Sequence, residues 1–429
     1  MTTFAIATLG CKVNSFESES YAESLIAIGY REVDFKERAD VYIINTCSVT
    51  NTAASKSRQK ISQAQRANPE ALICVVGCYA QTHAEELKSQ LGIDILIGAG
   101  GKTTLAKRIQ DALHQKGILY QTELSEIAGF EDLRVSKYSK QTRAFLKVQD
   151  GCNQFCAYCI IPYARGRERS LDPQSVVDQA IELSHNHPEI VLAGIHTGRY
   201  GKEHDFDLTA LIERILHQAS NLKRIRISSI EVTEITDAFI ALMKSERRIA
   251  RHLHIPLQSG CDATLKRMGR PYTTAEFLDR IARIRSEIPD ISISTDVIVG
   301  FPGEDEEEFY TTLTTIKKAA FSFMHVFPYS KRENTRAAEM DGQNSPQCKK
   351  QRVAAVQNLS FTLTESYLAS FIGKTLDVIV EQTDGSNGFG HSSEYIPVKY
   401  TNHRNHQAHD VIRRKGIGVI DGNIVTEEN

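Results

Sequence analysis

The chain has 429 residues, of which 41% are hydrophobic and 24% charged, and it contains no tryptophan. This composition is typical of a soluble globular protein with two or three domains. The net charge of −2 excludes a global electrostatic attraction to nucleic acid, so any RNA contact would need local basic patches. The first residues lack a signal-peptide pattern and no stretch approaches about 18 apolar residues, so we expect a cytoplasmic protein.

Residues 1–120 alternate apolar runs with stretches of helical periodicity. This pattern predicts a parallel sheet wrapped by helices, because buried parallel strands are continuous apolar runs. The four runs are "FAIATLGC" (4–11), "VYIINTC" (41–47), "ALICVVGC" (71–78) and "IDILIGAGG" (93–101). We therefore expect an N-terminal α/β domain.

Three cysteines of this domain, Cys11, Cys47 and Cys78, each follow a predicted strand. The carboxyl ends of parallel strands meet at one edge of a sheet, and ligands bind beyond that edge. The three thiols are thus predicted to converge on one object. The alternative is that they are ordinary buried cysteines, which is the interpretation we give to Cys74, inside the third run.

Residues 121–142 are polar with weak periodicity and are predicted to be a linker. From 143 to 366, six strand-like runs alternate with helical patterns. They predict a partial (β/α)6 barrel, smaller than the eight-unit form of about 250 residues, with functional groups at the strand carboxyl ends. The residues at those ends are Cys152, His196, Glu231, Gln258, Gly300 and Ser330.

Residues 367–429 form short alternating runs between Gly and Asn turns, which predicts a small all-β module. The module carries six Lys or Arg against eight Asp or Glu, so RNA binding by it would be electrostatically weak. Its histidines at 391, 403, 406 and 409 are interpreted as exposed loop residues rather than a metal site.

Cys152, Cys156 and Cys159 form a C-x₃-C-x₂-C pattern after the first barrel strand. A structural zinc site needs four ligands, and a disulfide would leave one thiol over. An iron–sulfur cluster on three thiolates leaves one iron open to a ligand with an amine and a carboxylate, such as S-adenosylmethionine. In a reducing cytosol, clustered cysteines favour metal binding or catalysis over disulfides.

With Phe155 and Tyr158 inside it, this motif resembles that of the radical S-adenosylmethionine superfamily. The resemblance implies that Cys152, Cys156 and Cys159 are catalytic: their [4Fe–4S] cluster reduces the sulfonium and releases a 5′-deoxyadenosyl radical that abstracts hydrogen. It also implies cofactor contacts at strand ends, where the alternative role is helix capping. The implied contacts are Tyr158, Gly194, Ser229, Glu231 and Asp296.

The stretches "TLGCKVNSFES", "INTCSVTNTAASKSRQ" and "GCYAQ" resemble the cysteine motifs of the methylthiotransferases, and the C-terminal module resembles a TRAM domain. The likeness implies a second [4Fe–4S] cluster on Cys11, Cys47 and Cys78 that holds sulfur. It implies two S-adenosylmethionine molecules per turnover, and both cysteine sets facing one cavity. The implied activity adds a methylthio group to C2 of an adenosine in tRNA.

Within that family, "LGCKVNSFE", "AGIHTGRYG" and "RIRISSIE" most resemble the branch acting on N6-threonylcarbamoyladenosine next to the anticodon. The alternatives are the branches acting on isopentenyladenosine in tRNA or on a ribosomal protein, or a non-catalytic iron–sulfur electron carrier. A carrier would use four thiolates per cluster, which argues against it. A reductant such as flavodoxin or ferredoxin is expected as a partner, and the sequence leaves the oligomeric state open.

Basic residues gather in several places where they would follow tRNA phosphates, the alternative being solvated surface. The run after the cluster motif is the favoured RNA contact because we expect it at the barrel mouth. The basic residues are Arg165, Arg167, Arg169, Arg224, Arg226, Lys266, Arg267, Arg270, Lys331 and Arg332.

Overall fold

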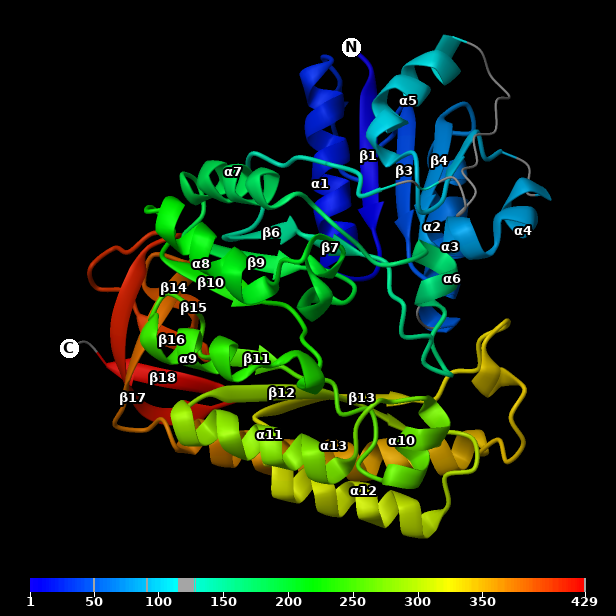
Figure 1. Cartoon of the computed structure of the whole chain (residues 1–429). Coiled ribbons are helices and arrows are strands. Elements are labelled where there is room, and N and C mark those ends of the chain that lie inside the picture. The colour runs from blue at the N-terminus through cyan, green and yellow to red at the C-terminus, as the bar shows by residue number, and fades with distance from the viewer. Residues whose placement is uncertain (49–50, 90–91, 115–126, 128, 428–429) are drawn as a thin grey trace.

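The computed structural model describes residues 1–48, 51–89, 92–114, 127 and 129–427. A parallel α/β part, a partial barrel and a small closed β-barrel follow one another along the chain (Figure 1), which confirms the predicted fold class. The first part of the predicted linker, 121–142, falls outside the described residues, so the domain boundaries stay predictions. Within the described ranges, no helix combines the length and the apolar character that crossing a bilayer requires.

The N-terminal part is a five-stranded parallel sheet in the order β2-β1-β3-β4-β5. Its central strands are buried on both faces, because adjacent residues such as Ile43 and Ile44 belong to opposite hydrophobic cores. This explains the continuous apolar runs. The two-residue edge strand β2 is too short and polar to have been predicted. The strands are β1 (Thr3–Thr8), β2 (Arg31–Glu32), β3 (Val41–Thr46), β4 (Leu72–Gly77) and β5 (Ile95–Ile97).

Helices cover both faces of this sheet. One face carries α1 (Lys12–Ala27) and α5 (Leu105–His114), whose apolar residues share a core with the barrel. The other face carries α2 (Asn51–Ala67), α3 (Cys78–Thr82) and α4 (Ala84–Ser89), which close a smaller core. The N-terminal part is therefore packed onto the barrel through the α1 and α5 face.

The central part contains two three-stranded parallel sheets, in the orders β10-β9-β6 and β11-β12-β13. An isolated bridge between Ile225 and Ile249 joins them into the predicted partial barrel. The strands are β6 (Arg143–Lys147), β9 (Glu189–Ala193), β10 (Arg224–Ile227), β11 (His252–His254), β12 (Ser292–Val299) and β13 (Phe323–Pro328). A small antiparallel ribbon, β7 (Gln149–Asp150) and β8 (Arg169–Ser170), flanks the cysteine loop.

Five of the barrel helices begin at a side chain that accepts a hydrogen bond from the backbone of the first turn, which satisfies an otherwise unpaired N–H group. The helices are α6 (Ile161–Arg165), α7 (Pro173–Ser184), α8 (Leu208–Gln218), α9 (Asp237–Ser245), α10 (Asp262–Met268), α11 (Thr274–Glu287) and α12 (Glu306–Ala319). The caps are Asp172, Asp207, Thr236, Thr273 and Asp305.

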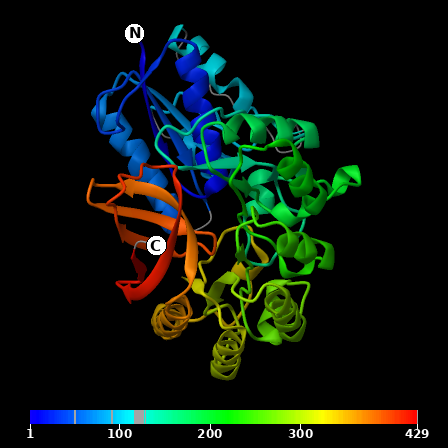
Figure 2. The ribbon, with the colours of Figure 1, turned by 90° about the vertical axis from the view of Figure 1, so that its left-hand side faces the viewer.

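Helix α13 (Pro346–Ala369) leads into a closed barrel in the order β14-β15-β16-β18-β17, which confirms the predicted all-β module. Alternate residues such as Val378, Val380 and Val398 fill its interior. Figure 2 shows its orange and red strands beside the partial barrel. The strands are β14 (Thr375–Thr383), β15 (Asn387–Ser392), β16 (Pro397–Thr401), β17 (Val411–Ile420) and β18 (Asn423–Glu427).

Two arginines of β10 dock this module onto the barrel. Arg224 and Arg226 are 5% and 3% exposed, and both pair with the buried carboxylate of Glu189 on β9. Their remaining N–H groups donate to backbone oxygens of the module, including those of Asp377 and Ser392. The prediction that these arginines follow tRNA phosphates or lie on a solvated surface is therefore wrong, because they are buried and paired.

Candidate active site

The three N-terminal cysteines lie at the predicted sheet edge. Cys11 precedes α1 directly, Cys47 follows β3, and Cys78 follows β4 and opens α3. Gly10 brings the first two together, because a Cβ on Gly10 would lie 3.2 Å from the Sγ of Cys47. Cys11 is exposed, whereas Cys47 and Cys78 are buried. The parallel strands thus gather thiols that are far apart in sequence.

Asn14, on the first turn of α1, ties these strand ends together. Its Nδ2 donates to the carbonyl oxygens of Leu9 and Thr46 and to the Oδ1 of Asn45, at 2.9–3.0 Å. Its Oδ1 accepts from the Sγ of Cys11 at 3.4 Å. One buried amide therefore fixes the ends of β1 and β3 and contacts the first cysteine.

The backbone before Cys78 requires glycine. Gly77 has a φ of +95°, and a Cβ there would lie 2.7 Å from both the Oδ1 of Asn45 and the carbonyl oxygen of Thr46. A side chain at this position would be strained by its backbone conformation and would collide with the neighbouring strand. The close approach of β3 and β4 thus depends on this residue.

The barrel cysteines lie on the loop that follows β7. All three are partly exposed. At the start of the loop, Gly151 has a φ of +70°, and a Cβ there would lie 1.9 Å from the carbonyl oxygen of Arg167. Burial and the neighbouring Cys156 raise the pKa of the Cys159 thiol to about 12. Burial therefore disfavours a thiolate at Cys159 unless a cation binds it.

The donor chemistry of both cysteine sets fits an iron–sulfur cluster, because each set offers three soft sulfur ligands. Across the part of the chain that the structure describes, no three His, Cys, Asp or Glu side chains converge to hold one metal ion.

Two of the predicted cofactor contacts lie beside the barrel cysteines. Arg270 ion-pairs with Glu231 and donates to the Sγ of Cys156 at 3.5 Å. The ring of Tyr158 packs edge-on against that of Phe301, with 6.5 Å between the ring centres. Burial raises the pKa of Tyr158 despite the positive charge of Arg270 nearby. Glu231, Arg270 and Tyr158 therefore form one group around Cys156.

The other predicted contacts lie along the neighbouring strand ends. Gly194 follows β9, and a Cβ there would come within 3.0 Å of the Oγ1 of Thr197. Ser229 follows β10 and is partly exposed. Asp296, on β12, pairs with the Nε2 of His254 at 3.2 Å. Glu231 stands at the N-cap of the short 3-10 helix Val232–Glu234, but its side chain makes no capping hydrogen bond there. Asp296 lies within β12 rather than at the start of a helix.

The structure adds His196, which the sequence indicated only as a strand-end residue. Its Nδ1 lies 3.5 Å from the Sγ of Cys152, and its Nε2 contacts the Oε1 of Glu234 at 2.7 Å. Burial alone would lower the pKa of His196, but the contacts with Cys152 and Glu234 raise it to about 10. The histidine is therefore a cation beside the cysteine loop.

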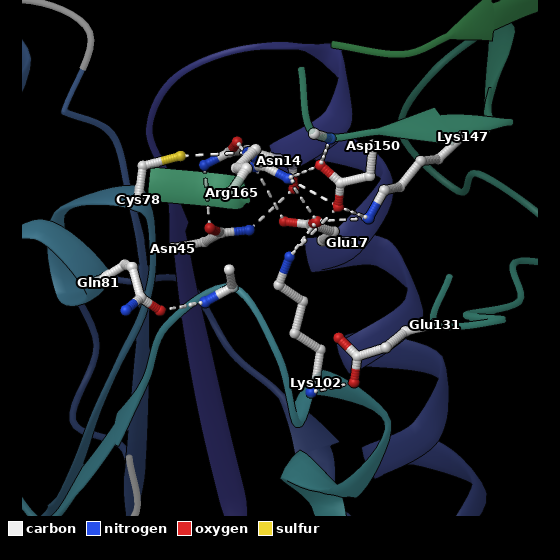
Figure 3. Close-up of polar contacts among 12 residues, drawn as sticks. Asn14, Glu17, Asn45, Cys78, Gln81, Lys102, Glu131, Lys147, Asp150 and Arg165 are labelled. Atoms are coloured by element: carbon white, nitrogen blue, oxygen red, sulfur yellow. Dashed lines mark hydrogen bonds and ion pairs between the residues drawn. The ribbon is translucent and has the colours of Figure 1, made fainter. Parts of the chain in front are cut away.

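The structure also corrects the role predicted for Arg165, which is 1% exposed and lies in a buried polar network (Figure 3). Its Nε donates to the Sγ of Cys78 at 3.2 Å, and its Nη2 donates to the Oδ1 of Asn14 at 2.8 Å. An RNA phosphate cannot reach this guanidinium, so the predicted RNA contact is wrong for Arg165. Arg167 is exposed, with its guanidinium 4.9 Å from the centre of the Phe155 ring.

Two carboxylates complete the network. The Nη1 of Arg165 donates to Glu17 on α1 at 3.0 Å and to Asp150 before the cysteine loop at 3.2 Å. Lys102 and Lys147 also pair with Glu17. Burial alone would raise the pKa of Glu17, but Arg165, Lys102 and Lys147 hold it well below its usual range. Both carboxylates are therefore charged, although they are buried.

Comparisons with known proteins place the chain among characterised enzymes. The family model "Uncharacterized protein family UPF0004" matches residues 3–98, and that of the radical SAM superfamily matches residues 146–316. Threonylcarbamoyladenosine tRNA methylthiotransferase MtaB of Bacillus subtilis (strain 168) is 43% identical, over 93% of this chain and 90% of its own length. The protein of that name from Aquifex aeolicus (strain VF5) is 37% identical, over 88% and 92%.

A tRNA-2-methylthio-N(6)-dimethylallyladenosine synthase from Thermoanaerobacter sp. (strain X514) is 35% identical, over 88% of this chain and 82% of its own. Among solved structures, the radical S-adenosylmethionine methyltransferase TsrM from Kitasatospora setae matches with a TM-score of 0.61 at 14% identity, covering 79% of this chain and 77% of that one. That likeness shows the fold. Membership of the radical SAM superfamily implies S-adenosylmethionine and a [4Fe–4S] cluster as cofactors. The identities, which extend over most of both chains, show that the chain belongs to the tRNA methylthiotransferase family.

Proposed function

We propose that this enzyme adds a methylthio group to C2 of N6-threonylcarbamoyladenosine next to the anticodon of tRNA, giving 2-methylthio-N6-threonylcarbamoyladenosine. Four relatives with 35–43% identity carry the name threonylcarbamoyladenosine tRNA methylthiotransferase. The observation that carries the proposal is the pair of three-cysteine sets, one at each of two strand-end edges, which Arg165 links by contacting Cys78 from the helix after the cysteine loop.

The proposal assigns one [4Fe–4S] cluster to Cys152, Cys156 and Cys159 and a second to Cys11, Cys47 and Cys78. Three thiolates from each set would leave one iron of each cluster without a protein ligand, which would allow S-adenosylmethionine to bind in the barrel and sulfur to bind in the N-terminal part. When bound, these groups supply the radical chemistry and the sulfur that an unactivated aromatic carbon–hydrogen bond requires. A reductant such as flavodoxin or ferredoxin is proposed as the electron source.

The chain's own residues would then orient the cofactor. Tyr158, Ser229, Glu231 and Asp296 offer polar groups around the barrel mouth. Gln149 and Thr197 fill the space in which a side chain of residue 194 would lie, so the proposed contact of Gly194 with the cofactor's amine would be made by its backbone. His196 and Arg270 contact the Sγ atoms of Cys152 and Cys156, so both side chains would help to orient these proposed ligands.

Mass spectrometry of nucleosides from the tRNA of cells with and without the gene tests the proposal. We expect 2-methylthio-N6-threonylcarbamoyladenosine to disappear without the gene and to return with the intact gene but not with Cys152→Ala. If only the dimethylallyl analogue is lost, this enzyme acts instead on the adenosine named for the Thermoanaerobacter relative. An unchanged tRNA would overturn the proposal and favour a ribosomal-protein substrate or an electron carrier. For a carrier, S-adenosylmethionine would leave the magnetic resonance spectrum of the reduced protein unchanged.

A further inference from the structure

Helix α6 connects the two cysteine sets. It begins at Ile161, two residues after Cys159, and ends at Arg165. Helix α6 packs against α3, which Cys78 opens, as Figure 1 also shows. The side chain that ends α6 therefore reaches from the barrel's cysteine loop to a cysteine of the N-terminal part.

The contacts of Arg165 use its guanidinium in three directions. The Nε donates to Cys78, the Nη2 to Asn14, and the Nη1 to both Glu17 and Asp150. A guanidinium is rigid and planar, so hydrogen bonds from all three of its nitrogens fix the positions of the side chains that accept them relative to one another. Asn14 in turn contacts Cys11 and the strand end before Cys47, so the fork is connected to the surroundings of all three N-terminal cysteines.

The charges of this network do not balance without Cys78. Five of its charged side chains are at most 2% exposed: the anions Glu17 and Asp150 and the cations Lys102, Lys147 and Arg165. One positive charge is therefore left over among these five, while the partly exposed Arg169 and Glu131 at the edge of the network add one charge of each sign. A buried charge without a counterion is costly, and Cys78 is the sulfur that faces the surplus cation.

We propose that Arg165 is the positioning residue of the N-terminal cysteine set. It fixes the Sγ of Cys78 by a hydrogen bond, places a positive charge beside it and thereby raises the reduction potential of the cluster that the set would hold. Hydrogen bonds to ligand sulfurs and nearby charge are the means by which a protein sets such potentials. This inference rests on the proposed function, which assigns a cluster to Cys11, Cys47 and Cys78.

The test isolates that cluster in a background variant, Cys152→Ala, Cys156→Ala and Cys159→Ala, reconstituted anaerobically with iron and sulfide. Iron content and a redox titration followed by electron paramagnetic resonance are measured with Arg165→Gln, Arg165→Lys and the control Arg169→Gln. Arg169 also pairs with Asp150, but its guanidinium bonds go to Asp150 and to the carbonyl oxygens of Arg165 and Arg167 rather than to Cys78. It therefore controls for loss of a charge near the network.

We expect Arg165→Gln to lower the reduction potential of the cluster by at least about 59 mV, which is a tenfold change in the one-electron equilibrium constant. We also expect it to change the electron paramagnetic resonance spectrum. Arg165→Lys keeps the charge but not the fork, so its shift should be smaller, and that of Arg169→Gln smaller still.

A loaded Arg165→Gln protein with an unchanged potential would overturn this inference and leave the proposed function intact. If Arg165→Gln does not fold, Arg165→Lys decides, and an unchanged spectrum and potential would overturn the inference. If the background variant itself binds no iron although the unmodified protein does, the second cluster and the role of Arg165 are both refuted.

Discussion

His196 lies with its Nδ1 3.5 Å from the Sγ of Cys152, while Glu234 holds its opposite ring nitrogen at 2.7 Å. Two contacts on opposite edges of the ring fix its orientation, so the imidazole presents one nitrogen to the cysteine. For the cluster proposed on Cys152, Cys156 and Cys159, a side chain that orients Cys152 in this way would have measurable consequences for metal binding.

Replacing this histidine is expected to weaken cluster binding in the barrel. For His196→Ala, we expect iron retention by the barrel set, challenged with a chelator, to fall by about 10-fold to 100-fold, the range found for partners of metal ligands. His204→Ala is the control, because His204 is exposed. Equal iron retention in both variants would show that the contact with Cys152 has no role in binding.

The two cysteine sets should lose iron independently. Two [4Fe–4S] clusters correspond to about eight iron atoms per chain. We expect about half to remain in the Cys152→Ala, Cys156→Ala, Cys159→Ala variant and about half in the Cys11→Ala, Cys47→Ala, Cys78→Ala variant. Iron and acid-labile sulfide assays check this. A matched variant, Cys348→Ala, should keep the full content, because Cys348 belongs to neither set. Full loss from either triple variant would contradict two separate clusters.

Glycine before Cys11 should be required for loading the N-terminal set. Gly10→Ala adds a Cβ 3.0 Å from that of Cys47 at a φ of +111°, so we expect reduced iron in this set and a cost of about 1–2 kcal/mol from the backbone alone. Gly29→Ala is the matched control, because Gly29 also has a positive φ of +89° but no atom lies within 4 Å of its added Cβ. Denaturant unfolding and iron assays of both variants distinguish the cost of the backbone conformation, which both share, from the collision with Cys47, which only Gly10→Ala makes. Normal loading of Gly10→Ala would contradict the close packing on Cys47.

The buried carboxylate of Glu189 should make stability depend on acid pH. Burial alone would raise its pKa, but Arg226 and Arg224 lower it from 4.5 to about 2. Because the pKa of Glu189 is lower in the folded than in the unfolded state, the carboxylate stabilises the folded protein at a pH above the unfolded-state pKa. This stabilisation is lost as the pH falls from about 4.5 toward 2. It is on the order of 3 kcal/mol.

Glu189→Gln tests this, with circular dichroism of denaturant unfolding between pH 7 and pH 3.5. We expect the free energy of unfolding of Glu189→Gln to differ from that of the unmodified protein by a constant amount above about pH 5. Below about pH 5 this difference should become smaller. The exposed Glu213→Gln should show no such difference. A Glu189→Gln difference that stays the same at pH 3.5 would show that the carboxylate is not held ionised by its arginines.

The meeting of Cys11, Cys47 and Cys78 at one sheet edge was predictable, because strand polarity alone determines which ends of parallel strands lie together. The same reasoning placed Cys152 at the end of a barrel strand. These inferences need only the order and direction of the strands, which can be predicted from the positions of the apolar runs in the sequence.

The environments of the arginines were not predictable. Arg165 pairs with Glu17, 148 residues earlier, and Arg226 with Glu189, 37 residues earlier. Arginine alone is typical of exposed surface, and its burial depends on a partner that only the fold brings near. Local sequence therefore favoured an RNA contact at Arg165 and left Arg226 between an RNA contact and solvated surface, although each arginine binds a carboxylate inside the protein.

The docking of the C-terminal module through main-chain oxygens has an evolutionary consequence. Arg224 and Arg226 recognise the carbonyl groups of Asp377, His391, Ser392 and Ser393, and every amino acid supplies a carbonyl. Substitutions in the module can therefore accumulate at these four positions without removing those bonds. The attachment of the module to these two arginines therefore depends on the path of its backbone rather than on the identity of its side chains at these positions.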